Sequence, residues 1–439
     1  MKRIIVVGGG LAGTEAAWYL ANRGFCVTLY EMRPLRATPA HNGGDLAELV
    51  CSNSLKSERL DTASGLLKAE LRLNRSVLMD VAEMCRVPAG AALAVNRSLF
   101  AAEATSRLSN HPNIVIKREE AAHIPEERPV ILACGPLASE NISGAIRDIT
   151  EGALYFVDAI SPIVSAESVD MSKGWFAGRY GKGGDDYLNL PMNSGQFDIF
   201  YETLISADLV KLHPFEDAKA FERCMPIEMM AARGKETLLF GPMRPVGLPE
   251  PATGRVPYAV VQLRLENKER TAYNIVGFQT KMTIPAQETA LRLIPGLENA
   301  EILRYGSVHR NAYVNAPASL NADLSLKGAR GVYLAGQITG VEGYLESMAS
   351  GIIAAMQVEA AAERRSPVAF RPETAFGALQ KHTEGKFGAE YAPGSFHFGM
   401  LPPLTQKARG KNERKLAYSK RALEYYGLGC AYGSVHSYR

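Results

Sequence analysis

Residues 4–13 read Ile-Ile-Val-Val-Gly-Gly-Gly-Leu-Ala-Gly, an apolar run that ends in the pattern G-x-G-x-x-G. At a strand-to-helix junction each glycine of this pattern has a task. Gly8 permits the tight turn, Gly10 lets the backbone approach a pyrophosphate, and Gly13 lets the helix pack close to the strand. The helix N-terminus then points at the phosphates. The stretch predicts a βαβ unit that binds a dinucleotide.

The following residues continue this unit. We predict a helix over residues 11–22 that stops at Gly24, a favourable C-cap. A second strand, residues 26–30, ends at Glu31. An acidic residue about 20 positions past the glycines is placed to accept hydrogen bonds from a ribose. Because all these signals occur in register, we expect a bound nucleotide and not merely a glycine-rich turn.

The bulk composition is typical of a soluble globular protein with two or three domains. The chain has 439 residues, of which 46% are apolar and 22% charged, and its formal net charge is +3. That charge neither demands nor excludes nucleic acid, because a local patch can bind a polyanion. Basic residues gather after Leu401, on either a solvated helix or a polyanion-binding surface. They are Lys407, Arg409, Lys411, Arg414, Lys415, Lys420, Arg421 and Arg439.

Cysteine spacing and hydropathy limit the class of protein further. No two of the six cysteines lie within three residues of each other, so the sequence predicts no C-x-x-C redox pair and no metal site. The first strand is expected to begin two residues after Met1, which argues against a signal peptide. No apolar run is long enough to predict a membrane span. We expect a cytoplasmic protein with reduced thiols and no membrane partner.

A second set of glycines lies near the C-terminus. A strand over residues 331–335 leads into a glycine-rich segment, and a helix is expected from about residue 346 to 362. A further strand, residues 129–134, also ends at a glycine. Both ends of the chain thus read as strand, glycines and helix. We predict an α/β fold whose discontinuous Rossmann-type domain consists of residues 1–164 and 304–439.

The middle of the chain, residues 165–303, has more turns and prolines and is predicted to be an inserted α+β domain. The apolar–polar alternation over residues 259–265 predicts a sheet with one wet face. Further strands are expected at residues 187–190, 237–240, 258–263 and 273–278.

Two glycine segments favour FAD over NAD or S-adenosylmethionine. FAD is the longer molecule and is usually held at both ends, so a C-terminal strand with Ala335-Gly336 suits its ribityl-pyrophosphate arm. The predicted cofactor-binding residues are Gly8, Gly9, Gly10, Ala12, Gly13, Glu31, Met32, Gly336, Gln337, Gly343 and Tyr344.

Several long strings resemble a known family. Residues 332–344 look like the signature of the flavoproteins that modify tRNA uridines, although Gln337 stands where the usual flavoenzyme has Asp. Four more strings, together with this one, resemble the folate- and FAD-dependent tRNA (uracil-5-)-methyltransferase family, TrmFO. The resemblance runs to about Ala361 and then fades. The four strings are residues 48–56, 223–228, 239–248 and 304–311.

The resemblance implies reductive methylation of uracil C5 in tRNA, at uridine 54 of the T loop. In the family, 5,10-methylenetetrahydrofolate gives the carbon, the flavin carries it, and NADH or NADPH supplies reducing equivalents. Uracil C5 is a poor nucleophile until a thiolate adds at C6, so the chemistry needs an activated cysteine and a base for the C5 proton.

Cys51 and Cys224 match the two functional cysteines of the family. We assign Cys224 as the nucleophile that attacks C6 and Cys51 to work beside the flavin, although the two roles can be exchanged. Lys56 and Arg59 follow Cys51 closely and are charges that can activate its thiol. The remaining cysteines, Cys26, Cys85, Cys134 and Cys430, are interpreted as small buried side chains.

Other residues are candidates for substrate contacts. His309 is expected to stack on the pterin of the folate, and Arg310 to meet a carboxylate or a phosphate. Glu342 is expected beside Tyr344 in the flavin pocket, while Lys281 contacts flavin or RNA or is simply solvated. The candidate RNA contacts are Arg223, Arg233, Lys235, Arg244 and the basic C-terminal residues.

Four alternatives stay open at this point. The same methylation can act on ribosomal RNA, or the chain can belong with the flavoproteins of wobble-uridine modification. It can also be a flavin oxidoreductase of small metabolites, or an RNA-binding flavoprotein without activity. Only the methyl-transfer readings require both Cys51 and Cys224. The oligomeric state is not predicted.

Overall fold

The protein is represented by a computed structural model that describes residues 2–38, 40–150, 153–181, 186–210, 225–267, 270–386, 391–405 and 410–426. For residues 153–160 and 307–311 only the backbone is described.

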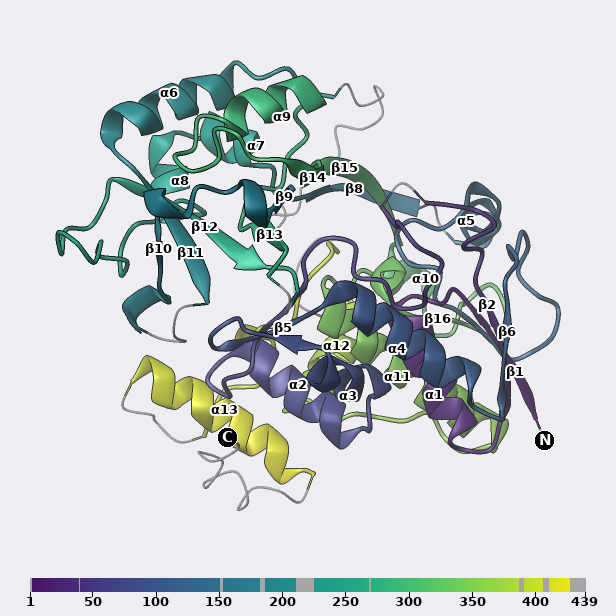
Figure 1. Ribbon diagram of the computed structural model, residues 1–439. Coiled ribbons are helices and arrows are strands. Elements are labelled where there is room, and N and C mark those ends of the chain that lie inside the picture. The colour runs from purple at the N-terminus through teal and green to yellow at the C-terminus, as the bar shows by residue number, and fades with distance from the viewer. Residues whose placement is uncertain are drawn as a thin grey trace.

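A five-stranded parallel sheet contains strands from both ends of the chain, in the order β16-β7-β1-β2-β6 (Figure 1). The C-terminal strand β16 pairs with β7, which pairs with the N-terminal strand β1. Residues 4–7 are buried, as expected for a parallel strand that is covered on both faces. The predicted Rossmann-type fold is confirmed. The strands are β1 (Arg3–Val7), β2 (Cys26–Tyr30), β6 (Ile114–Lys117), β7 (Val130–Leu132) and β16 (Val332–Leu334).

Two helices pack beside this sheet, and glycines allow their backbones to approach neighbouring segments closely. Helix α1 (Leu11–Ala21) connects β1 to β2, and α11 (Tyr344–Ala362) begins two residues before the predicted start. A Cβ on Gly13 would lie 1.8 Å from the carbonyl oxygen of Gly8, so no larger residue fits there. Similarly, a Cβ on Gly351 of α11 would lie 2.2 Å from the carbonyl oxygen of Ala12.

Further helices extend this half of the molecule, and several begin with capping side chains. Thr62, Ser76 and Asn96 each accept a hydrogen bond from a backbone N–H in the first turn of the helix that follows. The helices are α2 (Ala63–Leu73), α3 (Val77–Met84), α4 (Arg97–Ser109), α5 (Glu140–Arg147), α10 (Ala316–Ser319), α12 (Ala375–Thr383) and α13 (Lys411–Glu424). A small antiparallel sheet joins β3 (Ser54–Ser57), β4 (Arg86–Val87) and β5 (Ala92–Val95).

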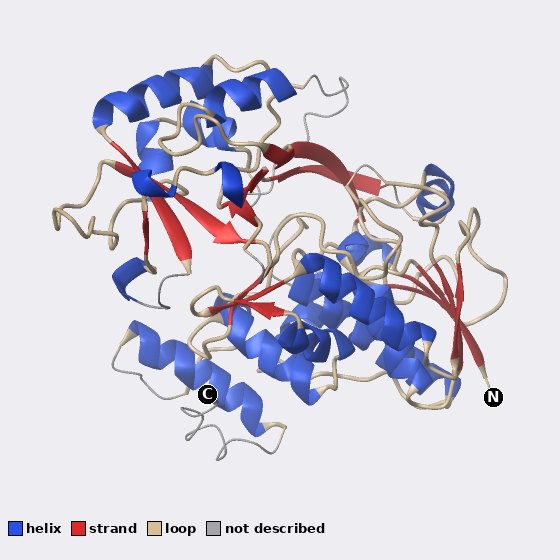
Figure 2. Ribbon diagram, viewed as in Figure 1, coloured by secondary structure: helices blue, strands red, loops and turns tan. Residues whose placement is uncertain are grey.

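The middle of the chain forms a separate six-stranded sheet with its own hydrophobic core, in the order β10-β11-β12-β13-β9-β14. Helices lie along its upper side in Figure 2. The strands are β9 (Ile163–Ser165), β10 (Trp175–Phe176), β11 (Tyr187–Met192), β12 (Ala259–Leu265), β13 (Ala272–Ile275) and β14 (Ile302–Arg304). The helices are α6 (Ser194–Ile205), α7 (Ile227–Ala232), α8 (Lys235–Phe240) and α9 (Ile284–Leu291).

Two predictions for this region were wrong. Residues 237–240 belong to helix α8 and not to a strand: Leu238 is buried in the core and Leu239 packs against it, while Phe240 is exposed. The wet face expected for β12 is absent, since six of its seven residues are buried. Its polar residues are covered by partners: Gln262 meets Asn189, and Arg264 meets Asn53.

Two strands connect the sheets. β8 (Ala153–Ile160) leads toward the six-stranded sheet and β15 (Ser307–Val314) returns from it, and the two pair as an antiparallel ribbon (Figure 1). Short 3-10 turns complete the described chain: η1 (Ala166–Ser168), η2 (Met171–Lys173), η3 (Arg179–Gly181), η5 (Gln337–Thr339) and η6 (Phe398–Met400).

Candidate active site

A cavity of about 1020 Å³, open solvent at its mouth included, lies at the carboxyl ends of the parallel strands. This is the edge at which α/β sheets bind their ligands. Residues from both chain ends line it. Of the predicted cofactor residues, it is lined by Gly8, Gly10, Ala12, Glu31, Met32, Gly336, Gln337 and Tyr344.

The first glycine segment fits a pyrophosphate. Gly10 lines the cavity and is the N-cap of α1, and a Cβ built on it would meet nothing within 4 Å. The first N–H groups of a helix have no partner within the helix, so they are free to bind an anion. Gly9 and Gly13 do not line the cavity, and they serve the turn itself: Gly9 donates to Glu31, while Gly13 lies against Gly8.

Glu31 is buried and already holds four donors. Its Oε2 accepts from the Gly9 N–H at 3.0 Å and from Arg33 Nη2 at 3.3 Å. Its Oε1 accepts from the Arg33 N–H and from Arg33 Nε, both at 2.9 Å. Burial alone would raise the pKa of Glu31, but the hydrogen bonds and charge of Arg33 hold it below its usual range. A ribose hydroxyl that donates to Glu31 would compete with the 3.3 Å contact, which is the longest of the four.

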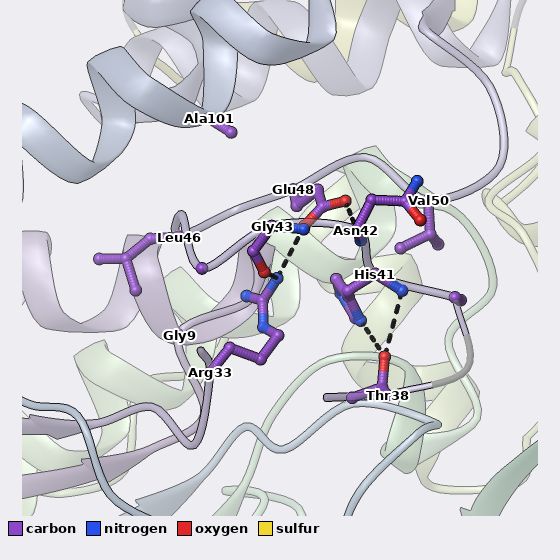
Figure 3. A network of polar contacts seen from close by, with 12 residues as sticks. Gly9, Arg33, Thr38, His41, Asn42, Gly43, Leu46, Glu48, Val50 and Ala101 are labelled. Atoms are coloured by element: carbon purple, nitrogen blue, oxygen red, sulfur yellow. Dashed lines mark hydrogen bonds and ion pairs between the residues drawn. The ribbon is translucent and has the colours of Figure 1, made fainter. Parts of the chain in front are cut away.

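Arg33 extends this network into the loop of residues 40–50 (Figure 3). Its Nη1 donates to Glu48 Oε2 at 2.9 Å, and Glu48 also accepts from the backbone N–H groups of Asn42 and Gly43. This loop forms a cavity wall that the sequence interpretation did not include. Glu48 could have been noticed, since it opens the family-like string of residues 48–56. The missed lining residues include Thr38, His41, Glu48, Val50 and Ser139.

The C-terminal glycine segment supplies the opposite wall. Gln337 Nε2 donates to Glu342 Oε2 at 2.8 Å, so the amide that replaces the usual aspartate is itself joined to a buried carboxylate. Gly343 does not line the cavity. It has a φ of 119°, and a Cβ on it would lie 2.4 Å from Glu346 Oε2, so a larger side chain is excluded at this turn.

Tyr344 connects the cavity to Cys51. Its phenol oxygen accepts hydrogen bonds from the backbone N–H of Cys51 at 2.7 Å and from that of Ser52 at 3.1 Å. Both Tyr344 and Val50, the neighbour of Cys51, line the cavity. Burial raises the pKa of Tyr344, and the nearby Cys51 raises it further. The loop that carries Cys51 is thus fixed to the first residue of α11, which lines the cavity, whereas Cys51 itself does not line it.

The cations that contact this loop are not those expected from sequence proximity. Lys56 pairs with Glu346 at 3.6 Å, and Arg59 pairs with Asp61. Three distant arginines hold the loop of residues 49–53 instead: Arg97, Arg264 and Arg304.

Several predicted residues fall outside what the structure describes. Cys224 and Arg223 lie in the gap at residues 211–224. For His309 and Arg310 only the backbone is described, in β15 opposite Asp158 and Val157.

The other substrate candidates lie on the six-stranded half. Lys235 Nζ pairs with Asp198 at 2.7 Å, and Arg244 Nη2 donates to the Tyr180 hydroxyl at 3.0 Å. Arg244 Nε is buried and has no hydrogen-bond partner in the part of the chain that is described.

Cys134 differs from its interpretation as an ordinary core residue, since it lines the cavity just after β7. Burial, together with the charge of Glu31, raises the pKa of its thiol to about 12. Cys85 is buried, as predicted.

No described helix is both long and apolar enough to cross a membrane. No group of three or more His, Cys, Asp or Glu side chains is arranged to hold a metal ion among the residues that the structure describes.

Comparison with known proteins identifies the family. The family model "Glucose inhibited division protein A" matches residues 3–366. The chain is 50% identical over 425 residues to the methylenetetrahydrofolate–tRNA-(uracil-5-)-methyltransferase TrmFO of Moorella thermoacetica, covering 97% of each protein. The TrmFO of Aquifex aeolicus is 51% identical over 424 residues, covering 96% of this chain and 95% of that protein.

Among solved structures, GidA of Aquifex aeolicus is similar in fold. Its TM-score is 0.69 at 16% identity, and the match covers 97% of this chain and 73% of GidA. The matches to the two TrmFO proteins, at about 50% identity, cover nearly the full length of both partners. This chain is therefore a member of the TrmFO family, within the broader group described by the GidA family model.

Proposed function

We propose that this protein is a folate- and FAD-dependent enzyme that methylates uracil C5 in tRNA, with 5,10-methylenetetrahydrofolate as the carbon donor. Family membership and near-complete coverage of relatives with this name support the activity. The structural observation that carries it is a dinucleotide cavity whose end adjoins a cysteine loop, through Tyr344 and Val50. A thiol beside a flavin is what this chemistry requires.

Within this proposal the bound flavin would carry the one-carbon unit and deliver hydride, with NADH or NADPH restoring its reduced form. Cys224 adds to uracil C6, which makes C5 nucleophilic. Cys51 lies beside the flavin ring and works on the carbon transfer or on the C5 proton. The target is uridine 54 of the T loop.

The chain's own residues would hold the cofactor in two places. The start of α1 at Gly10 faces the pyrophosphate, while Glu31 and Arg33 meet the ribose. Gln337, Glu342 and Tyr344 line the ribityl chain and the flavin. We further propose His309 and Arg310 for folate.

For RNA we propose Arg223, Lys235 and Arg244. Arg244 keeps a partly exposed guanidinium, whose Nη2 donates to the Tyr180 hydroxyl, and its charge is suited to a phosphate. The division into residues 1–164 with 304–439 and an insert of 165–303 is likewise proposed, as is a cytoplasmic location, where tRNA is modified.

A label-transfer assay tests the function. Purified protein with FAD, NADH or NADPH and T-loop RNA is given methylenetetrahydrofolate or S-adenosylmethionine, each labelled in its one-carbon group. Label should reach uracil C5 only from the folate. Label from S-adenosylmethionine alone, or a protein that takes up no FAD, would exclude the proposal. Ribosomal RNA and anticodon-arm RNA in parallel separate the alternative substrates.

A second assay tests the cysteine assignment. RNA that contains 5-fluorouracil should be captured covalently by the unchanged protein and by Cys51→Ala, but not by Cys224→Ala. Capture by Cys224→Ala at the normal level would exclude Cys224 as the nucleophile and place the attacking group elsewhere.

A further inference from the structure

Three arginines from three different elements converge on the loop of residues 49–53. Arg304, at the end of β14, donates through Nη2 to the carbonyl oxygen of Val50 at 2.9 Å and to that of Ala40 at 3.3 Å. Arg97, the first residue of α4, donates through Nη1 to the carbonyl oxygen of Leu49 at 3.3 Å. The backbone immediately before Cys51 is therefore held by two guanidinium groups.

Arg264 of β12 holds the other side of the loop. Its Nε donates to Asn53 Oδ1 at 2.9 Å, and its Nη2 donates to Ser52 Oγ at 2.8 Å. Asn53 in turn donates through Nδ2 to the carbonyl oxygen of Leu265 at 2.9 Å. The loop is thus fixed to the six-stranded sheet after Cys51 and to α4 and β14 before it, while Tyr344 fixes Cys51 itself.

The charges around the loop are unbalanced. Arg97 forms a two-point ion pair with Glu266, at 2.8 and 2.7 Å, but neither Arg264 nor Arg304 has a carboxylate partner among the described residues. Burial lowers the pKa of Arg304, and Arg97 lowers it further, while the charges of Tyr344, Cys51 and Glu266 oppose this. Arg264 is buried and Arg304 is partly buried. A cation withdrawn from water without a carboxylate is costly, and the oxygen atoms of the loop that accept from these two side chains offset part of that cost.

We propose that Arg97, Arg264 and Arg304 are positioning residues that fix Cys51 beside the cofactor cavity. The inference rests on the proposed function, in which Cys51 works beside the flavin. The arginines act through the peptide groups and side chains of residues 49–53. Because they come from both halves of the molecule, the loop keeps its place only when the two sheets are docked.

Arg304 is the residue to test, with Arg304→Met and Arg304→Lys compared. Methyl transfer to T-loop RNA gives kcat and KM, and hydrogen–deuterium exchange of the FAD-loaded protein reports the amides of residues 49–53. In Arg304→Met we expect kcat to fall about 10-fold with KM for RNA changed less than about 2-fold, because the thiol is misplaced and not the substrate. Exchange in the loop should speed up, and Arg304→Lys should recover most of kcat.

A matched control removes a similar arginine elsewhere. Arg179 also donates to two backbone carbonyl oxygens, those of Arg244 at 2.8 Å and Val246 at 2.7 Å, and has no described carboxylate partner. Arg179→Met should leave exchange in residues 49–53 unchanged. Ser52→Ala removes the Oγ that accepts from Arg264 and from the Ser54 N–H, but it removes no charge. It should speed exchange in residues 49–51, away from Ser54, even if Arg304→Met fails to fold.

The inference is overturned if Arg304→Met keeps its kcat, or if KM for RNA rises while kcat is constant, which would make Arg304 an RNA contact. Unchanged loop exchange in both Arg304→Met and Ser52→Ala overturns it as well. Hydrogen–deuterium exchange needs no turnover, so it tests the positioning role even if the unchanged protein transfers no methyl group. A failure of methyl transfer by the unchanged protein would reject only the proposed function.

Discussion

The phenol of Tyr344 organises the site at the scale of a single residue. One oxygen accepts from two consecutive backbone N–H groups, those of Cys51 and Ser52, and thereby joins the cysteine loop to the start of α11. Buried N–H groups that lose their acceptor cost free energy because water cannot replace it.

Tyr344→Phe should therefore destabilise the protein. Two N–H donors would lose their acceptor, at a cost of about 1–3 kcal/mol each if water is excluded. A lower melting temperature in differential scanning fluorimetry is the expected result. Tyr305→Phe is the control, since it removes only a hydroxyl that contacts Glu288 near the surface. Equal melting temperatures for the two variants would contradict the role of Tyr344.

Glu15 makes stability depend on pH. Burial raises its pKa from 4.5 to about 8, although Ser76 and the N–H groups of Val77 and Leu78 donate to it and oppose the rise. Between pH 4.5 and about 8 the folded protein thus keeps a proton that the unfolded chain releases. Stability contributed by this group is present below that window and is lost as the pH rises through it.

Glu15→Gln cannot titrate, so it should remove this component of the pH dependence. The melting temperature of the unchanged protein, relative to the variant, should fall as the pH is raised from 5 toward 9 across the titration of Glu15. Glu236→Gln, on an exposed helix position, controls for the loss of a surface carboxylate. A difference that is constant with pH would show that Glu15 does not titrate in this range.

At the scale of single residues, the sequence predicts a functional role where that role follows from the residue's position in a local motif. Gly8, Gly10, Gly13 and Glu31 were found because the βαβ unit fixes their spacing. The arginines of the cysteine loop were not found, because no local pattern links Arg264 of β12 to Asn53. The roles of Cys224 and of the folate and RNA residues stay predictions.

At the scale of elements, the packing of α1 on α11 depends on missing side chains. Gly351 lies within α11, where a Cβ would come within 2.2 Å of a backbone oxygen of α1. Backbone oxygen cannot rotate away, so any larger residue must push the two helices apart. Both helices begin at the cofactor cavity, and their separation therefore changes the cavity itself.

Gly351→Ala should lower both the melting temperature and the amount of FAD that copurifies. Gly144→Ala is a matched control, because Gly144 also lies in a helix but a Cβ there would meet nothing within 4 Å. That control should be stabilised by about 0.5–1 kcal/mol through helix propensity. Normal FAD content in Gly351→Ala would mean that the helices adjust without cost to the site.

Elements bounded by clear start and stop signals, such as the glycine motif and Gly24, were predicted well, and those decided by tertiary contacts were not. Helix α1 and strand β2 match their predicted ranges to within one residue. Residues 237–240 have strand-like composition but complete helix α8, which starts at Lys235. The polar face of β12 was predicted to be exposed to solvent. The prediction failed because the loop that covers Arg264 lies far from it in the sequence.

At the scale of the whole molecule, the two sheets are held together by polar contacts as well as by the ribbon of β8 and β15. The ion pair of Arg97 and Glu266 joins α4 to the end of β12, and both side chains are largely buried. A buried pair is much more sensitive to the loss of one partner than to the loss of both.

Glu266→Gln should destabilise the protein by about 3–5 kcal/mol, because Arg97 would remain buried without its carboxylate. The double variant Arg97→Met/Glu266→Leu should recover a large part of this loss. Calorimetric unfolding of the three proteins provides the comparison. A double variant less stable than Glu266→Gln would show that the pair contributes net attraction between the halves.

The paired strands β8 and β15 place the departure and the return of the chain side by side, with Ala153 opposite Val314. The six-stranded half therefore leaves and rejoins the nucleotide-binding half at one place, and none of its strands is threaded through the parallel sheet.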